Sequence, residues 1–90
     1  MVTKPFTFAG TALVLNTRTS AAGSVRVELQ RPEGTPLPGY TLADCVEIIG
    51  DEIDRGVTWR RGGDLSALAG QPVRLRVVLR DADLFSLKFR

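Results

Sequence analysis

The sequence predicts an all-β fold, specifically an antiparallel β-sandwich of jelly-roll-like form. In residues 73–90, apolar side chains alternate with polar or charged ones on both sides of Asp81-Ala82-Asp83, which predicts two half-buried strands joined by a tight turn. Residues 24–30 alternate in the same way. Glycine- and proline-containing turn signals recur at spacings of roughly 8–12 residues, which is typical of about six to eight short strands. No apolar repeat of helical period is long enough for a packed helix.

The N-terminal half is predicted to hold two strands and one shorter strand. In chain order these are residues 6–8, 11–17 and 24–30, with a turn of small residues at 20–23. In the strand 24–30, Val25, Val27 and Leu29 are expected to point inward. The opposite parity, which includes Glu28, is expected to face water.

The middle of the chain is predicted to be mostly irregular. Residues 31–39 hold three prolines and two glycines and form a turn with an irregular connection. The remaining predicted elements are one helical turn within 40–45 capped by Thr41, a short strand and bend at 46–53, a strand at 57–60, a turn at Gly62-Gly63, and a single turn at 64–70 closed by Gln71-Pro72.

The predicted core combines the inward positions of the stronger strands. Its members are Leu13, Leu15, Val25, Val27, Leu29, Val73, Leu75, Val77, Leu79, Phe85, Leu87 and Phe89. Such a core belongs to one β-sandwich domain spanning residues 1–90, which we interpret as either excised from a longer protein or stand-alone.

Composition excludes several function classes. The net charge of +2, with acids and bases interspersed, does not favour nucleic acid as a partner. No segment is apolar enough to span a membrane or to act as a signal peptide, and the compartment stays open. The absence of histidine removes the commonest general base. Cys45, the single cysteine, is expected to be a small buried apolar residue.

Two groups of charges have two interpretations each. Arg26, Arg74, Arg76 and Arg80 share a predicted outward face, which would suit an anionic ligand or partner; alternatively they pair across strands with Glu28, Asp81 or Asp83. The acids of residues 44–54 could hold Ca²⁺, but their spacing matches no calcium loop and suits a solvated bend equally well. We predict no metal and no cofactor.

Aromatic residues supply the candidate carbohydrate site. An exposed tryptophan or tyrosine can stack on the apolar face of a sugar ring, and neighbouring arginines would favour an acidic glycan. The candidate residues are Tyr40, Trp59, Arg60 and Arg61. Trp59 shares strand parity with Val57, however, which favours a position in the core.

Most of the chain, from about residue 11 to residue 89, resembles a family of bacterial proteins. The most specific segments are SAAGSVRVELQ, IIGDEI and VTWRRGGDLSALAGQPVRLRVVLRDADLFSLKF. They resemble the C-terminal β-sandwich domain of glycoside-hydrolase-like proteins in which a five-bladed propeller of the invertase/arabinanase type precedes the sandwich. The resemblance implies packing on a catalytic propeller. It assigns no catalytic residue to this chain, because the family's catalytic carboxylates lie on the propeller.

The sequence therefore predicts a non-enzymatic accessory domain of a carbohydrate-active protein, with a structural or docking role and a propeller as its partner. The alternative is an independent carbohydrate-binding module. A minimal glycosidase is disfavoured because a chain of this size offers little room for a deep cleft. Bare strand edges and a bare docking face would also favour a homodimer or higher homo-oligomer.

Overall fold

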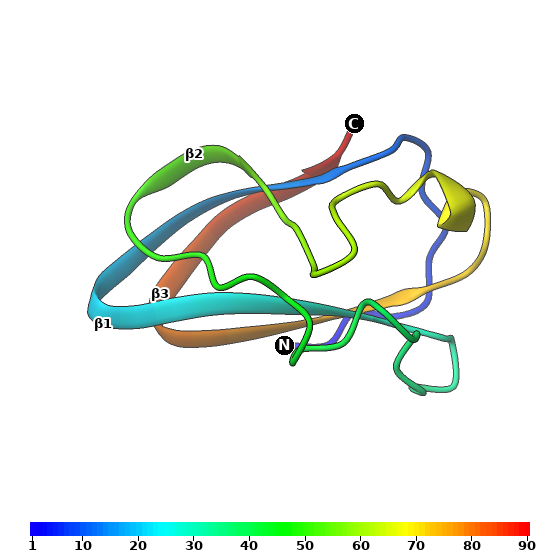
Figure 1. Ribbon diagram of the computed structural model, residues 1–90, viewed down its shortest axis with the longest axis horizontal. Coiled ribbons are helices and arrows are strands. Elements are labelled where there is room, and N and C mark those ends of the chain that lie inside the picture. The colour runs from blue at the N-terminus through cyan, green and yellow to red at the C-terminus, as the bar shows by residue number, and fades with distance from the viewer.

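The computed structural model describes residues 1–90 and confirms an all-β chain built on a three-stranded antiparallel sheet (Figure 1). The strands are β1 (Leu13–Gln30), β2 (Glu52–Gly56) and β3 (Arg74–Phe89), in the order β2-β1-β3. The single helical element is a 3₁₀ turn, η1 (Ser66–Leu68), where the sequence predicted one turn. No helix is long and apolar enough to cross a membrane.

The prediction of tight turns at 20–23 and 81–83 is wrong, because both segments lie inside long strands. β1 and β3 pair along nearly their whole length, from Leu13 with Phe89 to Gln30 with Arg74. The register jumps between the pairs Thr19–Ala82 and Ser24–Arg80, so residues 20–23 of β1 bulge opposite Asp81 alone. The small residues and aspartates that resemble a hairpin turn therefore form a bulge in a two-stranded ribbon.

This bulge coincides with a sharp bend of the ribbon. An extended strand as long as β1 would span about 60 Å, whereas the longest dimension of the molecule is 35 Å. Figure 1 shows β1 and β3 turning back together at one end of the molecule. Inward side chains from both halves of β1, such as Leu13 and Val27, consequently belong to one buried cluster.

Irregular segments extend the second half of the ribbon on both sides. Residues 1–6 run along the start of β3, where Phe6 and Val73 exchange backbone hydrogen bonds of 2.9 and 2.8 Å. On the other side, residues 36–48 run along β1, and Val25 and Ile48 exchange bonds of 2.9 and 3.0 Å. The outer edge of β3 from Val78 to Phe89 has no such backbone partner.

The predicted core is confirmed for its central members and wrong at its periphery. Leu13, Leu15, Val25, Val27, Leu29, Val73, Leu75 and Val77 are all buried. Leu79 is 39% exposed and Phe85 is 66% exposed, while Leu87 and Phe89 are partly buried against the cluster. Connecting segments complete the core with Cys45 and Trp59, whose burial the sequence predicted separately, and with Phe8, Tyr40, Ile48, Val57 and Leu65.

Gly23 marks a close approach of the two strands at the bend. A β-carbon at this position would fall against the carbonyl oxygen of Asp81 and 2.7 Å from that of Arg80. We expect Gly23→Ala to lower the free energy of unfolding by about 1–3 kcal/mol, because the strands must separate to admit the methyl group. Urea unfolding measures this. Gly56→Ala is the matched control, since no atom lies within 4 Å of the position that its methyl group would take; equal effects at both glycines would contradict the explanation.

Candidate functional site

Tyr40 and Trp59, the two aromatic candidates for sugar stacking, are buried against each other. Their ring centroids lie 5.4 Å apart at an angle of 75°, an edge-to-face contact. The Trp59 Nε1–H donates to the carbonyl of Val27 at 2.9 Å, and the Tyr40 hydroxyl donates to the carbonyl of Asp64 at 3.4 Å. Both polar atoms are thus satisfied inside the protein, and the core position predicted for Trp59 is confirmed.

Arg60 and Arg61, the two arginine candidates, point to different partners. The Arg61 guanidinium lies over the Tyr40 ring, 4.8 Å from its centroid, which is a cation–π contact. The Arg60 Nε lies 3.9 Å from a carboxylate oxygen of Asp44, and its side chain is exposed. The structure therefore brings Tyr40, Trp59 and Arg61 together as a packed cluster. Sugar binding at these residues stays a prediction, and this packing leaves neither aromatic ring open for stacking.

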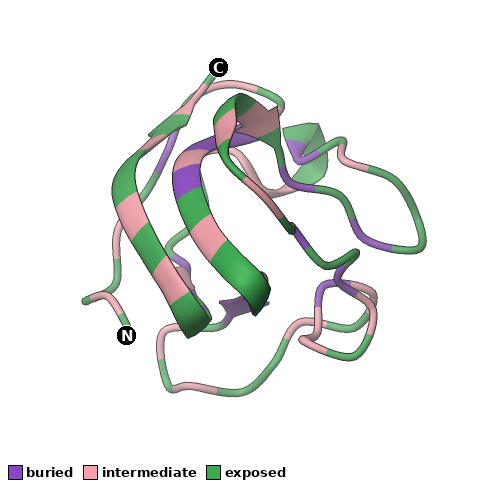
Figure 2. Cartoon of the chain, turned by 90° about the vertical axis from the view of Figure 1, so that its left-hand side faces the viewer, coloured by how far each residue is buried: buried purple, intermediate pink, exposed green.

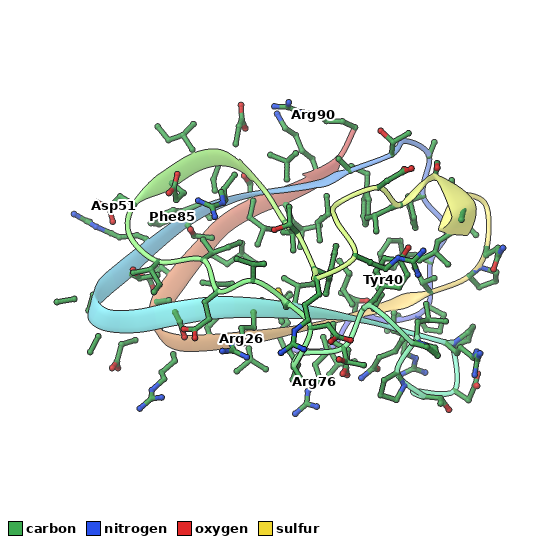
Figure 3. All side chains as sticks on the ribbon, in the orientation of Figure 1. Arg26, Tyr40, Asp51, Arg76, Phe85 and Arg90 are labelled. Atoms are coloured by element: carbon green, nitrogen blue, oxygen red, sulfur yellow. The ribbon has the colours of Figure 1, made fainter.

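The outward arginines are partly engaged in pairs within the chain. Arg26 donates to Glu47 at 2.6 Å and to the carbonyl of Leu42 at 3.3 Å. Arg76 lies 3.9 Å from Glu28, which is the cross-strand pairing that the sequence offered as an alternative. Figure 3 shows Arg26 and Arg76 on the same side of the molecule. These two guanidiniums are therefore not a free anion site.

The expectation that Glu28 faces water is wrong. The residue is buried, and its carboxylate accepts hydrogen bonds from the Gln30 side chain at 2.8 Å and from the Leu42 backbone at 3.2 Å. The connection that runs beside β1 covers this part of the strand. A buried carboxylate with these donors is a structural group that fastens the connection to the sheet.

The acids of residues 44–54 are spread among separate cations. No three of them come close enough together to hold a metal ion. Each instead has its own basic neighbour, so the segment is an array of ion pairs: Asp44 with Arg60, Glu47 with Arg26, Asp51 with Arg18, Glu52 with Arg55, and Asp54 with Lys88 and Arg90.

The pair of Arg26 and Glu47 makes the stability of the fold depend on pH. The hydrogen bond from Arg26 holds the pKa of the Glu47 carboxyl below its usual range. The unfolded chain therefore binds a proton at Glu47 before the folded chain does, so this pair stabilises the fold at neutral pH. That contribution is lost as the pH falls below about 4 and through the lower pKa of the folded state.

We expect Glu47→Gln to flatten the acid limb of the stability curve. Urea midpoints measured from about pH 7 to about pH 3 give this slope. Glu33→Gln is the matched control, because Glu33 makes no ion pair within the chain. A Glu47→Gln slope that matches wild type would contradict the assignment.

Breaks in the pairing register of β2 and β3 leave two apolar side chains, Ile53 and Phe85, projecting from the sheet. β3 skips a residue between its pairs Asn16–Ser86 and Thr17–Leu84, which leaves Phe85 unpaired. β2 breaks register between its pairs with Leu15 and Thr17, which leaves Ile53 and Asp54 unpaired there. Asn16 bridges both neighbours: its side-chain amide donates to Ser86 Oγ at 2.7 Å and accepts from the Asp54 backbone at 3.0 Å. These hydrogen bonds hold the two breaks side by side.

Ile53 and Phe85 line an open groove that we call the Phe85 groove. Ile53 is 86% exposed and Phe85 is 66% exposed. The groove has a volume of about 380 Å³, and the other lining residues are Asn16, Thr17, Arg18, Asp51 and Glu52. Figure 3 shows Phe85 and Asp51 at the same end of the molecule. Exposed apolar side chains with charged neighbours can contact an apolar side chain of a partner, or the face of a sugar ring.

Sequence reasoning missed this groove because it placed Phe85 in the core. Phe85 has the parity of Leu87 and Phe89, and an uninterrupted alternation would turn all three inward. The unpaired residue in β3 shifts the parity by one, so Leu84 takes the inward position. The adjacent apolar residues Leu84-Phe85 are the one sign in the sequence that the alternation breaks there.

Two further features are a hollow at the bend and the single cysteine. A second hollow of about 500 Å³ lies at the bend and is lined by Arg18, Thr19, Ser20, Asp81, Ala82 and Asp83. Cys45 is buried, as the sequence predicted, and its sulfur accepts a hydrogen bond from the Val27 backbone at 3.3 Å. Burial raises the pKa of the thiol, so it stays protonated and weakly nucleophilic at neutral pH.

No family model, no curated protein and no solved structure matches this chain.

Proposed function

We propose that this chain is a non-catalytic accessory domain, a jelly-roll-like β-sandwich that docks on a neighbouring domain of a carbohydrate-active protein. The doubling back of β1 and β3 around one buried cluster supports a two-layered arrangement. The resemblance of the sequence to domains that pack on a catalytic propeller gives the neighbour its proposed identity. The role is mechanical: the domain covers or orients its neighbour, and the neighbour carries the catalytic groups.

The Phe85 groove is the observation that carries the docking role. Large apolar side chains that stand exposed on a sheet are typical of surfaces that another protein covers. Ile53 and Phe85 stand where two neighbouring strands break register together, and the hydrogen bonds of Asn16 link both breaks. Exposed ionic side chains of Arg18 and Asp51 flank them, which resembles an apolar centre with a polar rim.

Calorimetric titration of this chain into a five-bladed propeller encoded in the same reading frame or operon tests docking. We expect binding by the wild-type chain and an increase of about tenfold or more in Kd for Phe85→Ser and for Ile53→Ser, since buried aromatic anchors dominate such interfaces. Ile49→Ser is the matched control, because Ile49 is 57% exposed and lies outside the groove. Equal Kd values for all variants, or no binding to such a propeller, would overturn the proposal.

One observation favours carbohydrate binding as a second candidate. Phe85 is an exposed aromatic ring with Asp51 and Arg18 beside it, a combination that can stack a sugar and hydrogen-bond its hydroxyls. If the groove binds sugars, titration with neutral or acidic oligosaccharides should shift the NMR resonances of the Phe85 ring and the Asn16 side-chain amide. Phe85→Ala would abolish those shifts. An absence of shifts with all sugars leaves docking as the better account.

A further inference from the structure

The outer edge of β3 from Val78 to Phe89 is bare. β3 is a margin of the sheet, and its other side is occupied by β1. Residues 1–6 cover only the beginning of β3, through bonds to Val73, Leu75 and Val77. Figure 2 shows β3 at the margin of the sheet, with alternating exposed and half-buried residues. A bare edge of this length is a template for another strand.

The side chains along this edge are arranged symmetrically about its centre. Asp81 and Asp83 precede the centre, and Lys88 and Arg90 follow it at matching distances. Ala82 and Leu84 on one side, and Leu87 and Phe89 on the other, are half-buried, whereas the charged residues are exposed. Phe85 and Ser86 are both exposed because β3 skips a residue there, so the irregularity falls at the centre of symmetry.

We propose that two copies of this chain pair antiparallel through these edges, with the two-fold axis between Phe85 and Ser86. Asp83 then lies opposite Lys88 of the second copy, and Asp81 lies opposite Arg90 of the second copy. The half-buried residues are also opposed to half-buried residues: Leu84 lies opposite Leu87 of the second copy, and Ala82 lies opposite Phe89 of the second copy. Exposed residues therefore face exposed ones and half-buried residues face half-buried ones, as directly opposed residues in an antiparallel pair must.

Ion pairs within one copy do not occupy the acidic residues that this pairing uses. Asp81 and Asp83 make no ion pair within the chain, while Lys88 and Arg90 share the single carboxylate of Asp54 at 3.3 and 3.6 Å. One end of the edge is therefore acidic and the other basic, and the antiparallel arrangement joins opposite ends.

The register follows from burial and charge together. A shift by one residue would put Phe85 or Ser86 opposite its own copy and exposed positions opposite half-buried ones on both sides of it. A shift by two residues would place Ser86 opposite Leu87, or Leu84 opposite Phe85, at the centre. It would replace the two kinds of attractive charge pair by a single kind, Asp83 with Arg90 or Asp81 with Lys88. The pairing with the axis between Phe85 and Ser86 satisfies both conditions at every position from 81 to 90.

Complementary charge reversals test this register. In Asp83→Lys the edge carries lysine at both 83 and 88, and in Lys88→Asp it carries aspartate at both. Each variant alone places like charges opposite each other, whereas a mixed dimer of the two variants restores both attractive pairs. The test is separate from that of the docking function, because neither substitution alters Phe85 or Ile53.

Sedimentation equilibrium up to millimolar protein measures the outcome, with circular dichroism to establish that each variant folds. We expect the wild-type chain to dimerise, each variant alone to show a dimer Kd raised by about tenfold or more, and an equimolar mixture to return toward the wild-type Kd. High salt should weaken the wild-type dimer. A monomeric wild-type chain, variants that dimerise like wild type, or a mixture that stays monomeric would each overturn the proposal.

Discussion

Trp59→Ala is expected to lower the free energy of unfolding by about 3–5 kcal/mol, a large share of the total for a domain of this size. The indole is among the largest fully buried side chains of the core. Its removal leaves a cavity next to Tyr40 and deprives the carbonyl of Val27 of its hydrogen-bond donor. Both losses act in the same direction, because a buried carbonyl without a partner is itself costly.

Trp59→Phe separates the two contributions. It keeps much of the ring volume and removes the Nε1–H donor, so we expect a smaller loss of about 1–3 kcal/mol. Urea unfolding monitored by circular dichroism measures both variants, since neither retains a tryptophan for fluorescence. Equal losses for the two variants would show that the hydrogen bond, and not the packing, dominates at this position.

Leu75→Ala is expected to cost about 2–5 kcal/mol, whereas Leu79→Ala should cost about 1 kcal/mol or less. Both leucines lie on β3 with the same parity, and both pair with apolar residues of β1, Leu29 and Val25. Leu75 is fully buried in the central cluster. Leu79 lies next to the bend, where the cluster no longer covers it.

This pair of variants is its own control, because the chemical change is identical. Guanidinium unfolding with a shared slope gives the difference in the free energy of unfolding directly. If Leu79→Ala proved as costly as Leu75→Ala, the bend would be more closely packed in solution than its exposed side chains indicate. If both were mild, β3 would not contribute the centre of the core.

The sequence was sufficient to predict an all-β chain and the centre of its core, because alternation of period two directly reports which side chains face inward. It was insufficient where the alternation is interrupted. Asp81-Ala82-Asp83 has the composition of a hairpin turn, and only the pairing of β3 with the distant strand β1 makes it part of a bulge. Turn propensity is local, whereas strand pairing here depends on residues far apart in the chain.

At the candidate site, too, strand alternation predicted some positions correctly, and pairing between distant segments decided the others. Parity with Val57 correctly placed Trp59 inside. The exposure of Phe85 depends on one skipped residue opposite Asn16 and Thr17, and a change of one residue moves a side chain to the other face of a sheet. The burial of Glu28 depends on a connection from residues 36–42 that no pattern in β1 reveals.

The pairing of β1 with β3 also determines when this chain can fold during its synthesis. Every pair in that ladder joins an early residue to a late one, Gln30 to Arg74 at the nearest and Leu13 to Phe89 at the farthest, and the amino group of Met1 is bonded to Val77. Contacts of such long sequence separation make folding slow, because a large loop must close before the contacts form. A nascent chain emerging from the ribosome therefore holds β1 without its longest partner until β3 has been made, with only β2 and residues 36–48 to pair with it, and its unpaired edge is open to aggregation during that interval.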